Sequence, residues 1–150
     1  MNIKEQLYID VKDAMRAKDS NKLMAMRLIT AAIKQIEIDE RIEVDDARVL
    51  IILDKLVKQR NDSISQFTAA GRLDLVEQEQ FELDIIKHYL PTPLSASEIT
   101  QHISDVLKGI NEPKMSDMGK IMTQLKPLLQ GRADMAQVSA TIKSMLAVQR

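Results

Sequence analysis

Apolar residues recur at every third or fourth position along most of this chain. The clearest example lies near the start, where Ile3, Leu7, Val11 and Met15 follow one another at intervals of four. This spacing places their side chains on one face of an α-helix. Turn-forming residues are scarce, with four glycines and four prolines in 150 residues, whereas an all-β chain needs many turns. The sequence therefore predicts an all-α protein.

Capping residues divide the chain into seven predicted helices. A polar side chain at the start of a helix accepts a free backbone amide, and a glutamate or glutamine three residues later completes a capping box. Gly71 closes the third helix, because glycine adopts the left-handed backbone most easily. Pro127 should stop or kink the sixth helix by about Leu125. The helices are predicted to open at Asn2, Ser20, Asp45, Asp74, Ser95, Ser116 and Asp134. Four of these residues are followed three positions later by the glutamate or glutamine of a capping box.

The segment LPTPLSASE, residues 90–98, contains two prolines in three positions. Proline cannot continue a helix, and it holds the residue before it in an extended conformation. This segment is therefore the predicted domain boundary. We expect an N-terminal four-helix domain over residues 1–92 and a small C-terminal three-helix domain over residues 95–150.

The composition excludes several kinds of site and location. The chain has no cysteine and only two histidines, which rules out disulfides, thiolate metal sites and cysteine nucleophiles. We expect no metal and no cofactor. The charged N-terminus lacks a signal-peptide pattern, and no segment approaches the roughly 18 uninterrupted apolar residues of a membrane span. These features favour a cytoplasmic protein with no membrane contact.

No sequence motif supports catalysis by the chain alone. MGK at residues 118–120 lacks the second glycine and the hydroxyl residue of a phosphate-binding P-loop. No serine lies in a nucleophile-elbow motif. Paired carboxylates such as Asp45 and Asp46 are typical of helix caps and charged loops. We therefore predict no catalytic residue.

Two groups of basic and polar residues remain as candidate binding sites. The chain as a whole has a net charge of −1, but residues 95–150 contain seven basic and five acidic residues, so a polyanion would bind more favourably there. A solvated helix face is the simpler explanation of the group on the third helix. The candidates are Lys58, Gln59 and Arg60 on that helix, and Lys120, Lys126 and Arg132 around the joint between the sixth and seventh helices.

Arg132 has no evident structural reason in the sequence, since it lies between a turn glycine and a helix cap. The two short helices joined at this point have the general form of a helix-turn-helix. The last helix, however, carries only Lys143 before the chain end and has no row of arginine or asparagine to contact base edges. We therefore do not expect sequence-specific binding to DNA.

Six segments occur in a characteristic order across nearly the whole chain: MRLITAAIKQIEIDER, LDKLVKQRNDSISQF, AAGRLDL, IIKHYLPTPLS, DMGKIMTQLKP and GRADMAQVS. Together they resemble the GatB/YqeY family, and specifically its free-standing YqeY-like members. The joint departs slightly, reading LPTPLS where the family often has glutamine after Leu-Pro. The resemblance implies a helical N-terminal domain followed by a small three-helix domain.

In larger relatives this region is the tail of the GatB component of the glutamine-dependent aminoacyl-tRNA amidotransferase, where it helps to hold the tRNA body. The resemblance also implies carbon–nitrogen ligase activity with glutamine as the amido donor, but the chain lacks the family's catalytic domain. We therefore expect a tRNA-binding or amidotransferase-associated module without a catalytic site. The partners implied are tRNA, amidotransferase subunits or an aminoacyl-tRNA synthetase. Two alternatives remain: a subunit that completes a partner's amidotransferase site, and a protein-interaction module with no RNA role.

Overall fold

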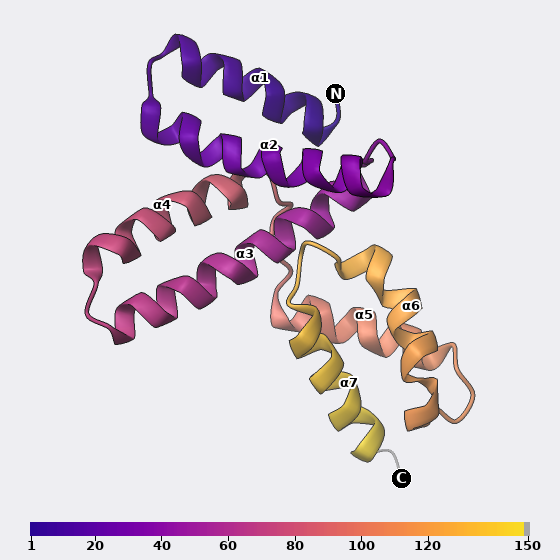
Figure 1. The fold of residues 1–150 in the computed structure, drawn as a ribbon. Helices are drawn as coiled ribbons and strands as arrows, with labels where there is room; N and C mark the ends of the chain where they lie inside the picture. Colours follow the sequence, from indigo (N-terminus) through magenta and orange to yellow (C-terminus); the bar gives the residue numbers. More distant parts are fainter. Residues whose placement is uncertain (149–150) are drawn as a thin grey trace. The chain divides into compact units, whose positions relative to one another are not determined.

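The computed structural model describes residues 1–148 as seven α-helices and one short 3-10 helix, with no β-strand in that range (Figure 1). The all-α prediction is thus confirmed. The helices are α1 (Ile3–Arg16), α2 (Ser20–Glu40), α3 (Asp46–Ala69), α4 (Leu73–His88), α5 (Ala96–Lys108), η1 (Met115–Asp117), α6 (Met118–Leu129) and α7 (Met135–Val148). The chain divides into two compact units, Met1–Pro91 and Thr92–Arg150, and each is described by itself.

The first unit is built from two helical hairpins, α1 with α2 and α3 with α4 (Figure 1). All four helices contribute to one apolar core. Its fully buried centre includes Leu7, Met26, Ile29, Val49 and Leu53. Ile86 brings the last turns of α4 into the same cluster. Most of the periodic apolar residues therefore meet in a single core, as their spacing predicts. Met15 is an exception to the predicted stripe: it is 50% exposed, and Ala14 lies in the core instead.

Polar contacts at the edge of this core act both within the first hairpin and between the two hairpins. Lys4 Nζ lies 2.7 Å from Glu37 Oε2, which joins α1 to the last turns of α2. The same carboxylate accepts the backbone amide of Val44 at 3.1 Å. The Lys4 ammonium and the Val44 amide lower the pKa of Glu37 below its ordinary value. Tyr89, which follows α4, donates its hydroxyl to Asp10 of α1 at 2.5 Å.

The second unit packs α5, α6 and α7 around a separate apolar core. Ile103, Ile121, Leu125, Leu129 and Ile142 are all fully buried in it. Leu94, which lies just beyond the two prolines, joins the same cluster. The segment before α5 is therefore part of this unit's core.

Several predicted helix boundaries are confirmed. Asn2 with Glu5 and Ser95 with Glu98 both form complete capping boxes. Asp45 caps α3 by accepting the amide of Arg48. Gly71 follows α3 with a φ of +70°, the left-handed conformation that favours glycine.

Three other predicted caps are wrong. Asp19, rather than Ser20, caps α2, and its carboxylate accepts the Lys22 amide at 3.2 Å. A carboxylate is the better acceptor at the positive end of the helix dipole. Asp74 lies inside α4 and pairs with Arg72 at 3.1 Å instead of capping that helix. Ser116 lies in η1, and α6 begins after Asp117.

Pro127 does not end α6 by Leu125, contrary to prediction, because the helix continues to Leu129. Proline removes one amide, which would have bonded to the carbonyl four residues earlier. Only this one bond is lost, and the Gln130 amide still closes the last turn on the Lys126 carbonyl at 2.9 Å. Gly131 then reverses the chain with a φ of +78°, and α7 starts directly after Asp134.

Candidate nucleic-acid interface

The solvent-facing side of α6 carries positive charge and no carboxylate. Ile121, Leu125 and Leu129 point into the core of the second unit at intervals of four. The opposite side, the α6 outer face, contains two lysines that make no ion pair within the described part of the chain. The α6 outer face consists of Gly119, Lys120, Thr123, Gln124, Lys126 and Pro127, all of them exposed.

Arg132 lies at the turn between α6 and α7, but it is engaged within the unit. Its guanidinium Nε donates a hydrogen bond to the Thr92 carbonyl at 3.2 Å, and its own carbonyl accepts the Leu94 amide at 2.9 Å. It therefore ties the proline-containing segment to the α6–α7 turn. This is the structural reason that the sequence did not reveal.

The charge of Arg132 also acts on a neighbouring carboxylate. The pKa of Glu98 is lowered, chiefly because Ser95 donates its backbone amide and its hydroxyl to the carboxylate. The positive charge of Arg132 adds to this effect. Arg132 is thus half-buried and partly compensated, unlike the two exposed lysines of the α6 outer face.

The candidates on α3 differ in their exposure. Lys58 and Gln59 are exposed, whereas Arg60 is half-buried against α4. Arg60 Nε lies 2.9 Å from Glu82 Oε2 and 3.5 Å from Glu79 Oε2. The structure therefore does not keep these three residues together as one free surface. They also belong to the first unit, whereas Lys120, Lys126 and Arg132 belong to the second.

The sequence analysis did not identify the acidic partners of Arg60, which are Glu79 and Glu82. The signal was present, because Arg60 and Glu82 both lie 11 residues from Gly71. In an antiparallel helical hairpin, residues equally distant from the turn lie opposite one another. Glu79 has a raised pKa because it is partly buried and lies near the Glu82 carboxylate, while Arg60 opposes the shift.

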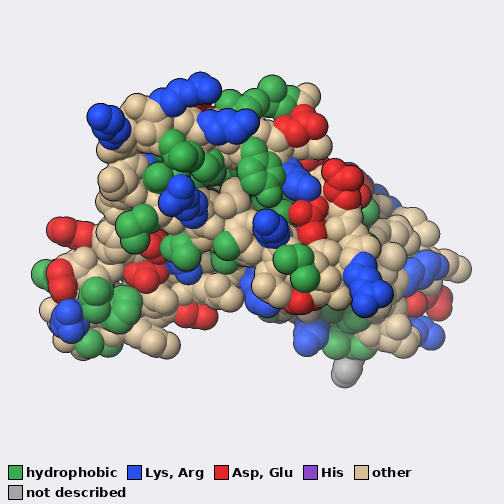
Figure 2. All heavy atoms as spheres, turned by 45° about the horizontal axis from the view of Figure 1, so that its top comes forward, with side chains coloured by type: hydrophobic (Ala, Val, Ile, Leu, Met, Phe, Trp, Pro, Cys, Tyr) green, Lys and Arg blue, Asp and Glu red, His purple; other side chains and the backbone are tan. Residues whose placement is uncertain are grey.

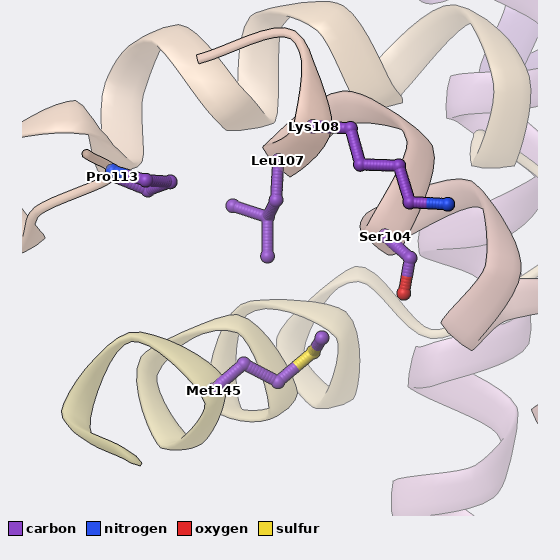
Figure 3. A pocket seen from close by; sticks show the side chains of 5 residues that line it. All are labelled: Ser104, Leu107, Lys108, Pro113 and Met145. Atoms are coloured by element: carbon purple, nitrogen blue, oxygen red, sulfur yellow. The ribbon is translucent and has the colours of Figure 1, made fainter. Parts of the chain in front are cut away.

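A small cavity of about 290 Å³ lies between α5 and α7 (Figure 3). Leu107, Pro113 and Met145 form its apolar walls, and Ser104 and Lys108 lie together on one side. This volume is at the lower end of the range for small-molecule sites. Among the described residues Lys108 is the one titratable side chain in the lining, so these residues do not pair an acid with a base.

Two further kinds of feature are absent from the described residues. Residues 1–148 contain no group of three His, Cys, Asp or Glu side chains that could hold a metal ion. In the same range no helix is both long enough and apolar enough to cross a membrane.

The fold is that of an all-helical protein of two small units, with a basic, carboxylate-free helix face in the second. This chain belongs to the family of YqeY-like proteins, because the model of the family described as Yqey-like protein matches residues 4–146. The resemblance seen in the sequence is thereby confirmed.

Fungal relatives cover most of the chain. A protein of Pyrenophora tritici-repentis is 33% identical over 145 residues, which cover 94% of this chain and 79% of that protein. A protein of Saccharomyces cerevisiae is 37% identical over 123 residues, 80% of this chain and 64% of that protein. A protein of Lachancea thermotolerans is 37% identical over 110 residues, covering 71% and 59%. The chain thus spans less than two thirds of the two yeast relatives.

All three relatives are named Altered inheritance of mitochondria protein 41, mitochondrial. Their mitochondrial names contradict the expectation of a cytoplasmic location. That expectation was drawn from the absence of cysteine, of a signal-peptide pattern and of a membrane span. These absences do not distinguish the cytoplasm from the interior of a mitochondrion. A protein of either location needs no cysteine, no secretory signal peptide and no membrane span.

Proposed function

We propose that this chain is a tRNA-binding module related to the amidotransferase tail, and that it contacts the RNA through the α6 outer face. In this proposal the two units are separate domains, four helices followed by three, and the second supplies the RNA contact. The observation that carries the proposal is the pair of exposed, unpaired lysines, Lys120 and Lys126, on a helix without a carboxylate. An exposed lysine without an acidic partner can bind a phosphate without first breaking an ion pair.

The α6 outer face suits the phosphate backbone better than the bases. Lys120 and Lys126 are six residues apart, or about 9 Å along the helix axis, so each can contact a different phosphate. Gln124 lies between them and can donate hydrogen bonds to phosphate and sugar oxygens, whereas the Thr123 hydroxyl is already donated to the Gly119 carbonyl at 2.8 Å. Residues 95–150 contain no aromatic residue, which removes stacking on bases. We therefore expect binding that is salt-dependent and largely independent of sequence.

The remaining candidates have other roles in this proposal. Arg132 positions the segment between Thr92 and Leu94 against the α6–α7 turn, and it contributes charge only secondarily. Lys58 and Gln59 remain available for a second contact, because both are exposed. Arg60 stabilises the α3–α4 hairpin instead, because it is already paired with two carboxylates. Amidotransferase subunits or an aminoacyl-tRNA synthetase are the protein partners that such a module would serve.

Filter binding of purified total tRNA to the full chain at two salt concentrations tests the proposal. We expect K120Q/K126Q to weaken binding at low salt and to lower the slope of log K against log salt by about two, one for each phosphate contact removed. The matched control is K108Q/K143Q, which removes two exposed lysines from α5 and α7. Absence of retention at low salt, or equal losses for both pairs, would contradict the proposal.

A further inference from the structure

The side of α2 that faces away from the first unit's core combines apolar and basic residues. Met24 is 67% exposed, Leu28 48% and Ile38 61%. Figure 2, in which the α1–α2 side comes forward, shows hydrophobic and basic side chains interleaved over this region. We name this surface the α2 outer face; its exposed residues are Met24, Arg27, Leu28, Ala31, Lys34, Gln35 and Ile38.

The α2 outer face has the spacing of a coiled-coil seam. Its central residues, at positions 24, 28, 31, 35 and 38, are separated by alternating steps of four and three. This is the heptad pattern in which positions a and d meet a second helix. Leu28 and Gln35 take position a, and Met24, Ala31 and Ile38 take position d. The side of α2 that packs on the core uses other residues, including Met26, Ile29 and Ile33.

Both cations fall at the position that selects a partner by charge. Arg27 and Lys34 are seven residues apart and occupy position g, which flanks the seam and pairs with charged residues of the partner helix. No acidic residue occurs between Ser20 and Ile36. Glu37 is bound to Lys4, and Asp39 accepts the side-chain amide of Gln35 at the end of the face. The seam is therefore flanked by uncompensated positive charge.

We propose that the α2 outer face docks one helix of another protein, with an apolar heptad seam and glutamate or aspartate beside it. Because the backbone of α2 is already folded, only the partner loses backbone freedom on docking. Gln35 at position a would fix the register, since a polar residue in a seam tolerates few alignments.

Other occupants fit this surface less well. In a second copy of the chain, an antiparallel pairing would bring Arg27 and Lys34 against the same cations, because position g then meets position g. In a parallel pairing position g meets position e, so Arg27 would face Ala32. Only Lys34 would then face a carboxylate, that of Asp39, which already accepts Gln35. Nucleic acid would leave Met24, Leu28 and Ile38 exposed to phosphates. A membrane surface needs a broad apolar face, whereas two cations and a glutamine interrupt this one. The proposal lies in the first unit and does not depend on tRNA binding by the second.

A charge-swap experiment tests this docking surface with the full chain. The probe is a fluorescent three-heptad peptide with leucine at a and d and glutamate at e and g; a second peptide has lysine at e and g. Each peptide repels itself, so both remain monomeric. Fluorescence anisotropy should show that the chain binds the glutamate peptide about tenfold more tightly than the lysine peptide, as expected for two charge pairs.

The R27E/K34E variant should invert this preference, whereas the matched control K22E/K55E should keep it. Both variants change the net charge equally, and all four residues are exposed. Leu28→Ser should weaken binding of both peptides without altering the helical circular dichroism. The proposal is overturned if the glutamate peptide does not bind or if R27E/K34E leaves the preference unchanged. It is also overturned if total tRNA, or vesicles of phosphatidylcholine and phosphatidylglycerol, displace the peptide.

Discussion

Arg132 Nε donates a hydrogen bond to the Thr92 carbonyl across 40 positions of sequence, at 3.2 Å. The bond joins the segment between the two prolines to the turn after α6. A second bond, from the Leu94 amide to the Arg132 carbonyl at 2.9 Å, lies beside it. The conformation of this segment is therefore held by the side chain and the backbone of one residue.

The change Arg132→Ala should lower the free energy of unfolding of the second unit by about 1 kcal/mol, the typical net value of one hydrogen bond. The matched change Lys126→Ala removes an exposed cation from the same region and should cost less than about 0.5 kcal/mol. Urea unfolding measures both values. In tRNA binding we expect the reverse order, with the larger loss for Lys126→Ala. If Arg132→Ala weakened binding more and left stability unchanged, the structural role assigned here would be wrong.

Arg60→Gln should destabilise the first unit by about 1–3 kcal/mol at neutral pH, because it leaves partly buried carboxylates without their countercharge. Burial and the Glu82 charge already raise the pKa of Glu79. A group with a raised folded-state pKa adds stability as the pH falls through that value, and removing Arg60 raises it further. The free energy of unfolding of the variant should therefore approach that of the parent chain as the pH falls toward the ordinary glutamate pKa of 4.5.

Urea unfolding at a series of pH values measures both free energies. The control is Lys58→Gln, which removes a neighbouring but exposed cation of α3 and should leave stability nearly constant over the series. A cost for Arg60→Gln that does not vary with pH would show that Glu79 does not titrate against Arg60.

Tyr89→Phe should cost about 1 kcal/mol through loss of the hydrogen bond to Asp10. Burial, together with the Asp10 carboxylate, raises the pKa of Tyr89 above its ordinary value of 10. The bond therefore contributes fully below the unfolded-state pKa and is lost as the pH rises through the folded-state value. Urea unfolding followed by circular dichroism at a series of alkaline pH values measures the free energy of unfolding of both chains. The difference between the parent chain and Tyr89→Phe should be constant up to about pH 10 and shrink at higher pH. The control Tyr8→Phe changes a tyrosine that is 39% exposed and should cost less than about 0.5 kcal/mol.

Leu125→Ala and Leu128→Ala compare two leucines of one helix. Leu125 is fully buried, whereas Leu128 is 45% exposed. We expect Leu125→Ala to cost about 2–5 kcal/mol, since it removes transfer energy and leaves a cavity. Leu128→Ala should stay below about 1 kcal/mol. Denaturant unfolding measures both costs. Equal costs would show that Leu125 does not lie on the buried face of α6.

Local chemistry made the helices predictable. The Asn2–Glu5 and Ser95–Glu98 boxes use residues three positions apart, so the sequence alone contains the whole interaction. The errors came where two neighbours compete for one role, as at Asp19 and Ser20, or where a helix continues past the one hydrogen bond that a proline removes, as at Pro127. Such small differences are decided by the packing of the surrounding turns.

The candidate site was predictable only in part. Lys120 and Lys126 were identified by charge alone, and they are exposed. Arg60 and Arg132 belonged to the same predicted sets, but their partners lie 22 and 40 positions away. A search along the chain for basic residues cannot separate a free cation from a paired one, because pairing depends on which helices meet.

The sequence by itself determined the helical class, the proline-containing joint and most helix ends of this protein. These features follow from interactions within one helical turn or from the periodic spacing of apolar residues, so residues close together in the sequence are enough to predict them. Only the tertiary structure decided which cations stay exposed and which face of α2 remains uncovered. Both depend on contacts between helices that are distant in sequence, and burial makes those contacts strong enough to override local preference.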